Sequence, residues 1–251
     1  MPQDLTEPGG GVRLHVDAPL LEKAPITPSD GQSHYLLNVM RARLGDRLRL
    51  FNGRDGEWQA RVVEIGKRRC RLECERQTAA QREVPDIWLV FAPIKKTPAD
   101  YLAQKATELG TRMLQPMITR RSIVRRVNTA RIEANAVEAA EQSGRLTVPD
   151  VREPKAFEAL IADWPANRQI VFCDEGGDAP PIAQALGTAG AAPCAIFTGP
   201  EGGFDPAERR ALRELPQVLP VSLGERILRA DTAALAALAV WQAIRGDWSR
   251  P

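Results

Sequence analysis

The sequence predicts an α/β protein in which a small, mostly β domain precedes a larger domain built on a parallel sheet. Three observations support this prediction. Over residues 1–80, short segments alternate apolar and polar side chains and are separated by glycine turns. From residue 86 onward, continuous apolar runs alternate with helical segments, as expected when helices cover both faces of a parallel sheet. The polar stretch 76–83 has no periodicity, which is typical of a linker.

The N-terminal domain, residues 1–80, is expected to be a small β-barrel. The dipeptides Asn52-Gly53 and Asp55-Gly56 are turn signals between two alternating segments. One short helix interrupts the strands; it starts near Ser29 and covers 34–41. The predicted strands are 12–16, 48–51, 58–62 and 69–74. Short strands at close spacing with glycine turns favour a barrel.

The C-terminal domain, residues 84–251, is expected to contain an open parallel sheet. Its first strand, 87–91, is apolar throughout, as expected for a strand buried on both faces. A helix over 99–109 ends at Gly110, and a longer helix covers 129–144. The other predicted strands are 113–118, 169–173, 194–198 and 217–221. A site is expected at the carboxyl ends of these strands, because open parallel sheets bind their ligands there.

Composition excludes several classes of protein. Of the 251 residues, 43% are hydrophobic and 26% are charged, so the chain is globular rather than disordered. No apolar run reaches the roughly 18 residues of a membrane span, and the first residues lack the basic and apolar regions of a signal peptide. Four cysteines without a C-x-x-C pair, and two distant histidines, predict no metal site. Free thiols are typical of a reducing, cytoplasmic compartment.

Positive charge is concentrated in two zones, although the net charge is only +2. Residues 41–82 carry twelve Lys and Arg against six Asp and Glu, and residues 95–131 carry nine against two. Two basic zones on an otherwise acidic chain favour an anionic partner such as RNA or DNA. A solvated surface is the alternative for each zone. Lys95 and Lys96 follow the first predicted strand of the sheet, where they either contact phosphate or lie in a solvated loop.

The segment most informative about function is a glycine-rich loop, residues 199–203, directly after a predicted strand that ends at Thr198. Its three glycines let the backbone adopt a positive φ and let a ligand approach closely. Asp205 then begins a helix as its N-cap, with Glu208 completing a capping box. The loop is neither a P-loop nor a G-x-G-x-x-G dinucleotide fingerprint. An ordinary turn between strand and helix is the alternative, although such a turn usually needs only one glycine.

A second informative segment follows the predicted strand that ends at Val221. Gly224 ends the strand, and a helix over 231–244 is apolar almost all round, which is typical of a helix buried in a core or a subunit interface. Arg226, Arg229 and Asp231 stand at the entrance of this helix, where they either cap it or serve a site.

Several motifs together resemble the RsmE family. In the C-terminal part they are Thr198-Gly-Pro-Glu-Gly-Gly-Phe204, Leu223-Gly-Glu-Arg-Ile-Leu-Arg-Ala-Asp-Thr-Ala233, Gln104-Lys-Ala-Thr-Glu-Leu-Gly110 and Glu138-Ala-Ala-Glu-Gln-Ser-Gly-Arg145. In the N-terminal part they are His34-Tyr-Leu-Leu-Asn-Val-Met-Arg-Ala-Arg43 and Gly45-Asp-Arg-Leu-Arg-Leu-Phe-Asn-Gly53. The resemblance covers nearly the whole chain, and the order and spacing of the motifs make it specific.

The resemblance implies a fold and an activity. Members of the RsmE family transfer a methyl group from S-adenosylmethionine to N3 of a uridine in the decoding region of 16S ribosomal RNA. The implied fold is a PUA-like barrel followed by a SPOUT domain, whose C-terminal part forms a deep trefoil knot and which acts as a homodimer. Composition and periodicity do not indicate a knot, since knots are rare.

The resemblance also implies roles for particular residues. The glycine loop is expected to wrap the cofactor, and Leu223–Leu228 to close over its adenine, with Phe172 and Cys173 lining the same pocket. The expected cofactor-binding residues are Phe172, Thr198, Gly199, Pro200, Glu201, Gly202, Gly203, Leu223, Gly224, Ile227 and Leu228. The expected RNA-binding residues are Arg13, Arg41, Arg43, Lys95 and Lys96.

The implied reaction sets requirements for catalytic residues. Uridine N3 is poorly nucleophilic until its proton leaves, and charge then builds on O2 and O4, so a donor and a proton acceptor are needed. We expect Arg229 to stabilise this anion, with Arg226 as the alternate, and the proton to pass to Asp231, Glu201 or water. The family usually has Glu at position 231, and the shorter Asp changes the reach of that carboxylate unless it only caps the helix.

Two other functions fit the same sequence. A non-enzymatic RNA-binding assembly factor would keep the basic barrel and use the α/β domain for dimerisation. A SPOUT methyltransferase acting on transfer RNA, or on another ribosomal RNA position, would share the pocket and differ in the target base.

Overall fold

The computed structural model describes residues 11–176, 178–188, 190 and 192–249, with no description of the Lys96 side chain. Contacts divide the chain into two units. The first contains the described residues up to 83 together with 140–148, and the second contains 84–139 and the residues from 149 onward. Each unit has its own sheet and its own hydrophobic core.

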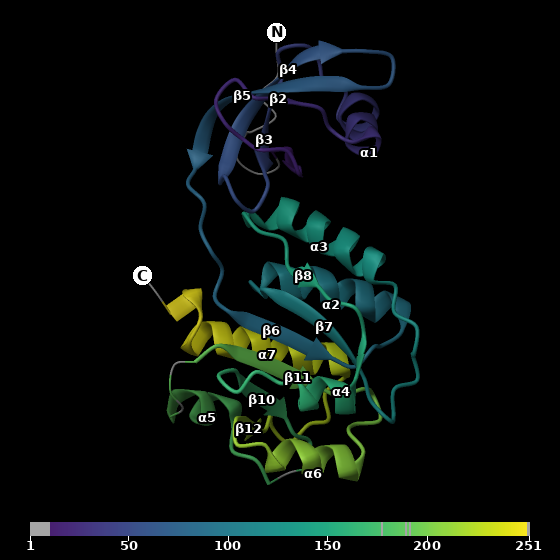
Figure 1. The fold of residues 1–251 in the computed structure, drawn as a ribbon, viewed down its shortest axis with the longest axis vertical. Helices are drawn as coiled ribbons and strands as arrows, with labels where there is room; N and C mark the ends of the chain where they lie inside the picture. The colour runs from purple at the N-terminus through teal and green to yellow at the C-terminus, as the bar shows by residue number, and fades with distance from the viewer. Residues whose placement is uncertain (1–10, 177, 189, 191, 250–251) are drawn as a thin grey trace. The chain divides into compact units, whose positions relative to one another are not determined.

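The first unit is a curled five-stranded sheet around an apolar core (Figure 1). Strand β1 (Arg13–His15) is parallel to β3 (Arg47–Phe51), and the other neighbouring strands are antiparallel. The sheet order is β1-β3-β4-β5-β2, with β4 at Glu57–Ile65, β5 at Cys70–Ala79 and β2 at Pro25–Ile26. Leu36, Leu48, Leu50 and Leu72 are fully buried in its core.

The linker and the helix of this unit differ most from the prediction. Strand β5 continues to Ala79, so the linker predicted from residue 76 was wrong for its first four residues. Those polar residues remain in the strand because they pair with β4 as far as Glu57, across register shifts that break their periodicity. The predicted helix over 34–41 is α1 (Asp30–His34) followed by a π-helical turn, η1 (Tyr35–Val39). Ser29 caps α1 in a capping box with Gln32.

The second unit contains the predicted parallel sheet. Its strand order is β12-β10-β11-β6-β7-β8, with every pair parallel. The strands are β6 (Ile87–Phe91), β7 (Met113–Ile118), β8 (Asp150–Val151), β10 (Gln169–Cys173), β11 (Cys194–Thr198) and β12 (Val218–Val221), and β9 (Lys155–Ala156) pairs with β7 off this path. The helices are α2 (Lys96–Glu108), α3 (Thr129–Ser143), α4 (Phe157–Ala162), α5 (Ile182–Thr188), α6 (Pro206–Glu214) and α7 (Ala230–Ile244), and a short 3₁₀ turn, η2 (Asp247–Ser249), follows. The residues of α3 from 140 onward belong to the first unit. Helix α2 begins three residues earlier than predicted.

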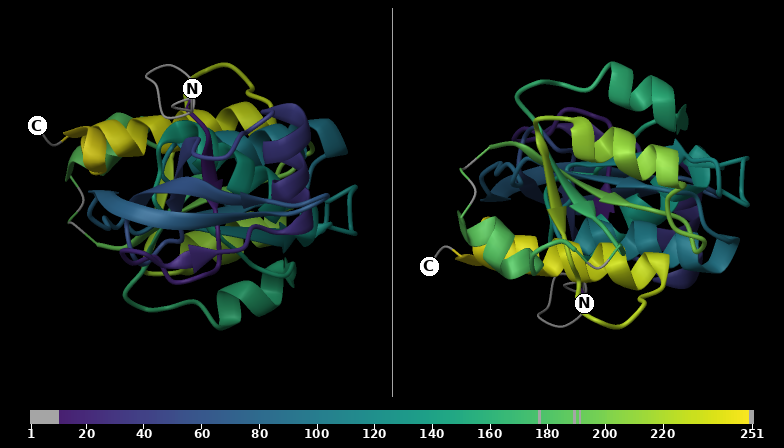
Figure 2. Two further views of the ribbon diagram at one scale, coloured as in Figure 1. Left: turned by 90° about the horizontal axis from the view of Figure 1, so that it is seen from above. Right: turned by 90° about the horizontal axis from the view of Figure 1, so that it is seen from below.

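Helices cover both faces of this sheet (Figure 2). Side chains along each strand alternate between the faces. On one face, Leu89 and Ile196 pack against α2, α5 and α7. On the other, Val90 and Phe197 pack against α4 and α6. This two-sided burial explains the continuous apolar runs in the sequence.

The topology brings two loops together at the carboxyl edge of the sheet. Strands β12, β10 and β11 are neighbours, so the segments after Cys173, Thr198 and Val221 leave the sheet side by side. The trefoil knot implied by the family resemblance stays a prediction. Within the described part of the chain, no helix is both long enough and apolar enough to cross a membrane.

Candidate active site

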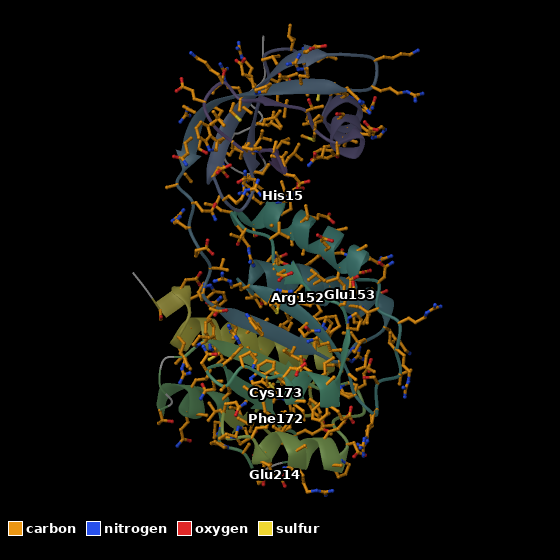
Figure 3. All side chains as sticks on the ribbon, viewed as in Figure 1. His15, Arg152, Glu153, Phe172, Cys173 and Glu214 are labelled. Atoms are coloured by element: carbon orange, nitrogen blue, oxygen red, sulfur yellow. The ribbon has the colours of Figure 1, made fainter. Side chains whose placement is uncertain are left out.

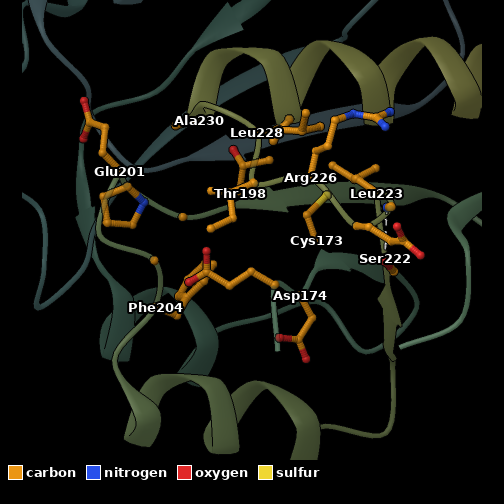
Figure 4. Close-up of a pocket in the computed structure, with 18 residues that line it drawn as sticks. Cys173, Asp174, Thr198, Glu201, Phe204, Ser222, Leu223, Arg226, Leu228 and Ala230 are labelled. Atoms are coloured by element: carbon orange, nitrogen blue, oxygen red, sulfur yellow. Dashed lines mark hydrogen bonds between the residues drawn. The ribbon is translucent and has the colours of Figure 1, made fainter. Parts of the chain in front are cut away.

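A cavity lies between the glycine loop, residues 199–203, and a second loop, residues 222–228, here called the closing loop (Figure 4). The end of β10 and the start of α7 complete its wall. The space between the two loops is about 820 Å³ when the solvent at its open side is counted.

The glycine loop is held in place by contacts at several of its residues. A Cβ on Gly199 would lie 2.9 Å from the ring of Phe204, which packs against that backbone. Gly203 has a φ of +67°, and a Cβ there would lie 1.6 Å from a carboxylate oxygen of Glu175. Gly199 is therefore favoured by the close approach of the Phe204 ring, and Gly203 by its backbone conformation.

The helix that follows fixes the end of the glycine loop. Asp205 accepts from the Ala207 N–H over 2.9 Å, and the Glu208 carboxylate accepts from the Asp205 N–H over 3.0 Å. This is the predicted capping box, with Pro206 in the first helical turn. Arg121 donates to the carbonyl oxygen of Gly202 over 2.9 Å, so the loop is also fixed from the side.

The closing loop has few internal contacts. Gly224 has a φ of +101°, and its N–H donates to the Ser222 hydroxyl over 3.2 Å. The side chain of Ile227 is 94% exposed. Among the described residues, no acceptor is found for the backbone N–H groups of Leu223, Ile227 and Leu228. These residues are exposed or partly exposed, so their N–H groups are accessible to a ligand.

A buried carboxylate anchors the third wall of the cavity. The side chain of Asp174, directly after β10, is 1% exposed and accepts from Arg209 Nε and Arg213 Nε, both over 2.7 Å. Its burial would raise the pKa, but hydrogen bonds from Arg209, the Gly176 N–H and Arg213 outweigh burial, so the Asp174 pKa is lowered. The two arginines also bind Asp178, which connects this segment to α6.

The only thiol on the cavity wall, among the described residues, belongs to Cys173. Burial raises its pKa to about 12. It is therefore a neutral thiol at physiological pH, and a thiol is a much weaker nucleophile than a thiolate. The cavity consequently lacks a thiolate that would compete with a substrate for an electrophilic group.

Nine of the eleven predicted cofactor-binding residues line this one cavity. They are Thr198, Gly199, Pro200, Glu201, Gly203, Leu223, Gly224, Ile227 and Leu228. Phe172 does not line it, which corrects the prediction. Strand alternation turns Phe172 to the opposite face of the sheet, where it packs against Phe204, whereas its neighbour Cys173 lines the cavity (Figure 3). Gly202 is also absent from the lining, and its carbonyl binds Arg121.

The three predicted catalytic residues occupy different positions. Arg226 lines the cavity, but its side chain extends away from Glu201, which lies at the opposite end (Figure 4). Arg229 is the exposed N-cap residue of α7 and is not part of the lining. Asp231, in the first turn of α7, accepts from the Thr232 N–H over 2.8 Å and so satisfies one unpaired donor at the helix start.

Of the predicted RNA-binding residues, Arg13 is corrected by the structure. It is 8% exposed, pairs with Glu57 over 2.7 Å and donates to three main-chain carbonyl groups of residues 140–145. A guanidinium with these partners is not available to phosphate. Arg41, Arg43 and Lys95 are exposed, and the side chain of Lys96 lies outside the described residues.

Sequence reasoning missed part of the wall. Asp174, Glu175 and Ser222 line the cavity without having been predicted. Their position in the sequence could have indicated them, because all three lie within two residues of the end of a predicted strand, on the edge where ligands bind. Among the described residues, no group of three or more His, Cys, Asp or Glu could hold a metal ion.

A parallel sheet with a cavity at its carboxyl edge is the arrangement in which open α/β proteins bind their ligands. The chain belongs to the RNA methyltransferase family: residues 81–242 match the RNA methyltransferase domain, and residues 28–74 match the RNA methyltransferase PUA domain. The PUA-like and SPOUT fold class implied by the resemblance is thereby confirmed.

Individual relatives agree with this assignment. Ribosomal RNA small subunit methyltransferase E of Rickettsia conorii is 32% identical over 90% of this chain and 93% of its own length. The structure of ribosomal RNA small subunit methyltransferase E from Neisseria gonorrhoeae bound to S-adenosylmethionine is 30% identical, covers 94% of this chain and 99% of its own, and has a TM-score of 0.85. A putative methyltransferase from Legionella pneumophila with bound cofactor SAM is 27% identical, covers 94% and 98%, and has a TM-score of 0.83.

Proposed function

We propose that this protein methylates N3 of a uridine in 16S ribosomal RNA, in the decoding region, with S-adenosylmethionine as the methyl donor. The observation that carries this proposal is the single cavity formed by the glycine loop and the closing loop in a chain of the RNA methyltransferase family. Relatives that span almost the same length are named ribosomal RNA small subunit methyltransferase E, and a similar structure was solved with S-adenosylmethionine bound.

The cavity residues suit S-adenosylmethionine. The closing loop offers unpaired backbone N–H groups at Leu223, Ile227 and Leu228, which can bind the ring nitrogens of an adenine. Glu175 and Glu201 place carboxylates at the wall, where they can bind hydroxyl or ammonium groups and favour a positively charged ligand. When bound, the cofactor supplies an electrophilic methyl group on a sulfonium.

The protein's own residues then have three tasks at uridine. The base must be held with N3 in line with the methyl group, and a rigid glycine loop supports such alignment. Arg229 stabilises the negative charge that builds on the uracil oxygens; this is supported by its exposed position between Leu228 and Ala230, both of which line the cavity. Arg226 is the alternate, and its side chain extends away from Glu201.

The proton on N3 also needs an acceptor. We propose that Glu201, Asp231 or a water molecule accepts this proton. Glu201 is exposed and lines the cavity, which favours it. Asp231 already accepts a hydrogen bond from the start of α7, as expected for a helix-capping role.

The proposal also covers the RNA-binding residues, the oligomeric state and the cellular compartment. RNA is expected to contact Arg41, Arg43, Lys95 and Lys96. A homodimer is supported by α7, whose Leu235 and Val240 are only partly buried in the described chain. The cytoplasm is supported by the presence there of ribosomal RNA and by four free cysteines.

Mass spectrometry of 16S RNA from a deletion strain tests the proposal. Treatment with the purified protein and S-adenosylmethionine is expected to restore one N3-methyluridine in the decoding region. Modification of another ribosomal position or of transfer RNA would replace the proposed target. Titration calorimetry with S-adenosylmethionine supplies the second measurement, and no binding would indicate an RNA-binding factor without enzymatic activity.

A further inference from the structure

A loop in the second unit concentrates positive charge near the cavity. Residues 119–126, here called the arginine loop, contain four arginines and no acidic residue. The loop follows Ile118, the last residue of β7, and β7 is parallel to β6 in the sheet whose carboxyl edge carries the cavity. The arginine loop therefore starts on the same edge of the sheet as the cavity (Figure 1).

The start of the arginine loop is a tight, fixed turn. Thr119 and Ser122 are buried, and the Thr119 N–H donates to the Ser122 hydroxyl over 3.0 Å. The two hydroxyl groups lie 2.9 Å apart, and the Ser122 N–H donates back to the Thr119 carbonyl oxygen over 3.1 Å. This turn holds the intervening Arg120 and Arg121 with their side chains exposed.

Arg120 is neutralised by neighbouring carboxylates. Its backbone N–H donates to Glu208 over 2.8 Å, and its guanidinium lies 3.5 Å from Asp205 and 3.7 Å from Glu158. Arg120 therefore connects the arginine loop to the start of α6 and to α4, and it contributes little free charge.

The other three arginines keep their charge. Arg121 donates to the Gly202 carbonyl oxygen, and a carbonyl does not cancel the charge of a guanidinium. No described carboxylate lies within ion-pair distance of Arg121, Arg125 or Arg126, and all three are exposed. Ile123, between them, is 75% exposed, so the surface combines cations with an apolar side chain.

We propose that the arginine loop is a contact surface for the substrate RNA and that Arg121 positions the glycine loop beneath it. This inference rests on the proposed function. A base that enters the cavity brings its flanking phosphates past the carboxyl edge of the sheet, where Arg125 and Arg126 present free guanidinium groups suited to phosphate. Ile123 suits the exposed face of a neighbouring base. Arg121 binds the glycine loop directly, so its loss affects the cofactor as well as the RNA.

The test measures binding of deproteinised 16S RNA from a deletion strain at several salt concentrations, without cofactor. Arg125→Ala with Arg126→Ala is expected to weaken binding and to reduce the slope of log K against log salt by about 0.7 for each contact to single-stranded RNA that is lost. Affinity for S-adenosylmethionine stays unchanged in this variant. Arg121→Ala is expected to lower the affinity for both ligands.

Arg112→Ala is the matched control, because Arg112 is exposed at the opposite end of the same strand. It removes one positive charge and is expected to leave the salt slope unchanged. An unchanged slope in the double variant, or an equal loss in the control, would overturn the proposal. Failure of the proposed function has a different signature, since the unsubstituted protein would then transfer no methyl group while its RNA affinity was still measurable.

Discussion

The two loops that form the cavity differ in how firmly the rest of the protein holds them. The glycine loop is packed against Phe204 and Glu175, bound by Arg121 and followed by a complete capping box. The closing loop is held at its first residue, Ser222, by main-chain hydrogen bonds with Pro180 and Ile182. Beyond Ser222 it has a hydrogen bond from Gly224 to Ser222 and an almost fully exposed Ile227. The first wall is therefore preorganised, and we propose that the second gains hydrogen-bond partners when a ligand binds. Each prediction below tests this difference.

The largest effect is expected at Arg229, where the closing loop meets α7. Arg229→Ala should slow single-turnover methyl transfer about a hundred-fold or more, because losing one donor to a developing anion costs about 3 kcal/mol. Affinity for S-adenosylmethionine should stay nearly unchanged. Arg226→Ala is the comparison variant and should have the smaller effect on rate. A full single-turnover rate in Arg229→Ala would exclude this role.

Next in size is the effect of Asp174→Asn on stability. The buried carboxylate accepts hydrogen bonds from two arginines, so the substitution should lower the free energy of unfolding by about 2–3 kcal/mol at pH 7. The Asp174 pKa is lowered in the folded state, so its stabilisation is present above the unfolded value of about 4 and is lost as the pH falls through the folded value.

Urea denaturation of both proteins over a pH series checks this prediction. The difference in stability should be constant near neutrality and should shrink below about pH 4. Asp178→Asn is the control, because that carboxylate is exposed and binds the same arginines. An equal loss in the control would show that burial of Asp174 is not the cause.

Two glycines allow a direct comparison of the loops. Gly203→Ala should weaken S-adenosylmethionine binding at least ten-fold, because a Cβ there displaces the Glu175 carboxylate from the cavity wall and a positive φ costs about 1–2 kcal/mol. Gly224→Ala has the backbone cost alone, because nothing lies within 4 Å of its Cβ. Calorimetry should therefore show the larger loss for Gly203→Ala, and equal losses would contradict the difference in packing.

The smallest effect is expected for Ile227→Ala. The side chain is 94% exposed, so the free energy of unfolding should change by less than about 0.5 kcal/mol. Dissociation of S-adenosylmethionine should be a few-fold faster if Ile227 closes over the bound cofactor. Stopped-flow measurement of the dissociation rate tests this role. The rate would not change if the Ile227 side chain only faced solvent.

The sequence predicted the parts of the site that depend on local chemistry. Both loops could be placed in the sequence from their glycines, from the N-cap at Asp205 and from the ends of the apolar strands. Turns and caps are determined by neighbouring residues, so the local sequence is enough to predict them. The resemblance to a family then supplied the cofactor, which spacing alone did not indicate.

The remaining features depend on contacts between distant segments. Arg13 was expected to bind RNA, but it pairs with Glu57, which lies far along the chain. Asp174 was not expected at the site because its partners, Arg209 and Arg213, belong to α6. In the sequence, the arginine loop could be predicted only as part of a basic zone. Its position beside the cavity depends on the pairing of β7 with β6, which the sequence does not show. Such partners are determined by topology and not by nearby sequence.

Phe204 links the cavity to the interior of the second unit. Its ring packs against Gly199 in the glycine loop and also against Phe157 and Phe172 beneath the sheet. Grafting the glycine loop alone onto another scaffold would therefore fail to reproduce the cavity. An engineered version with altered donor selectivity would need this aromatic cluster redesigned together with the loop.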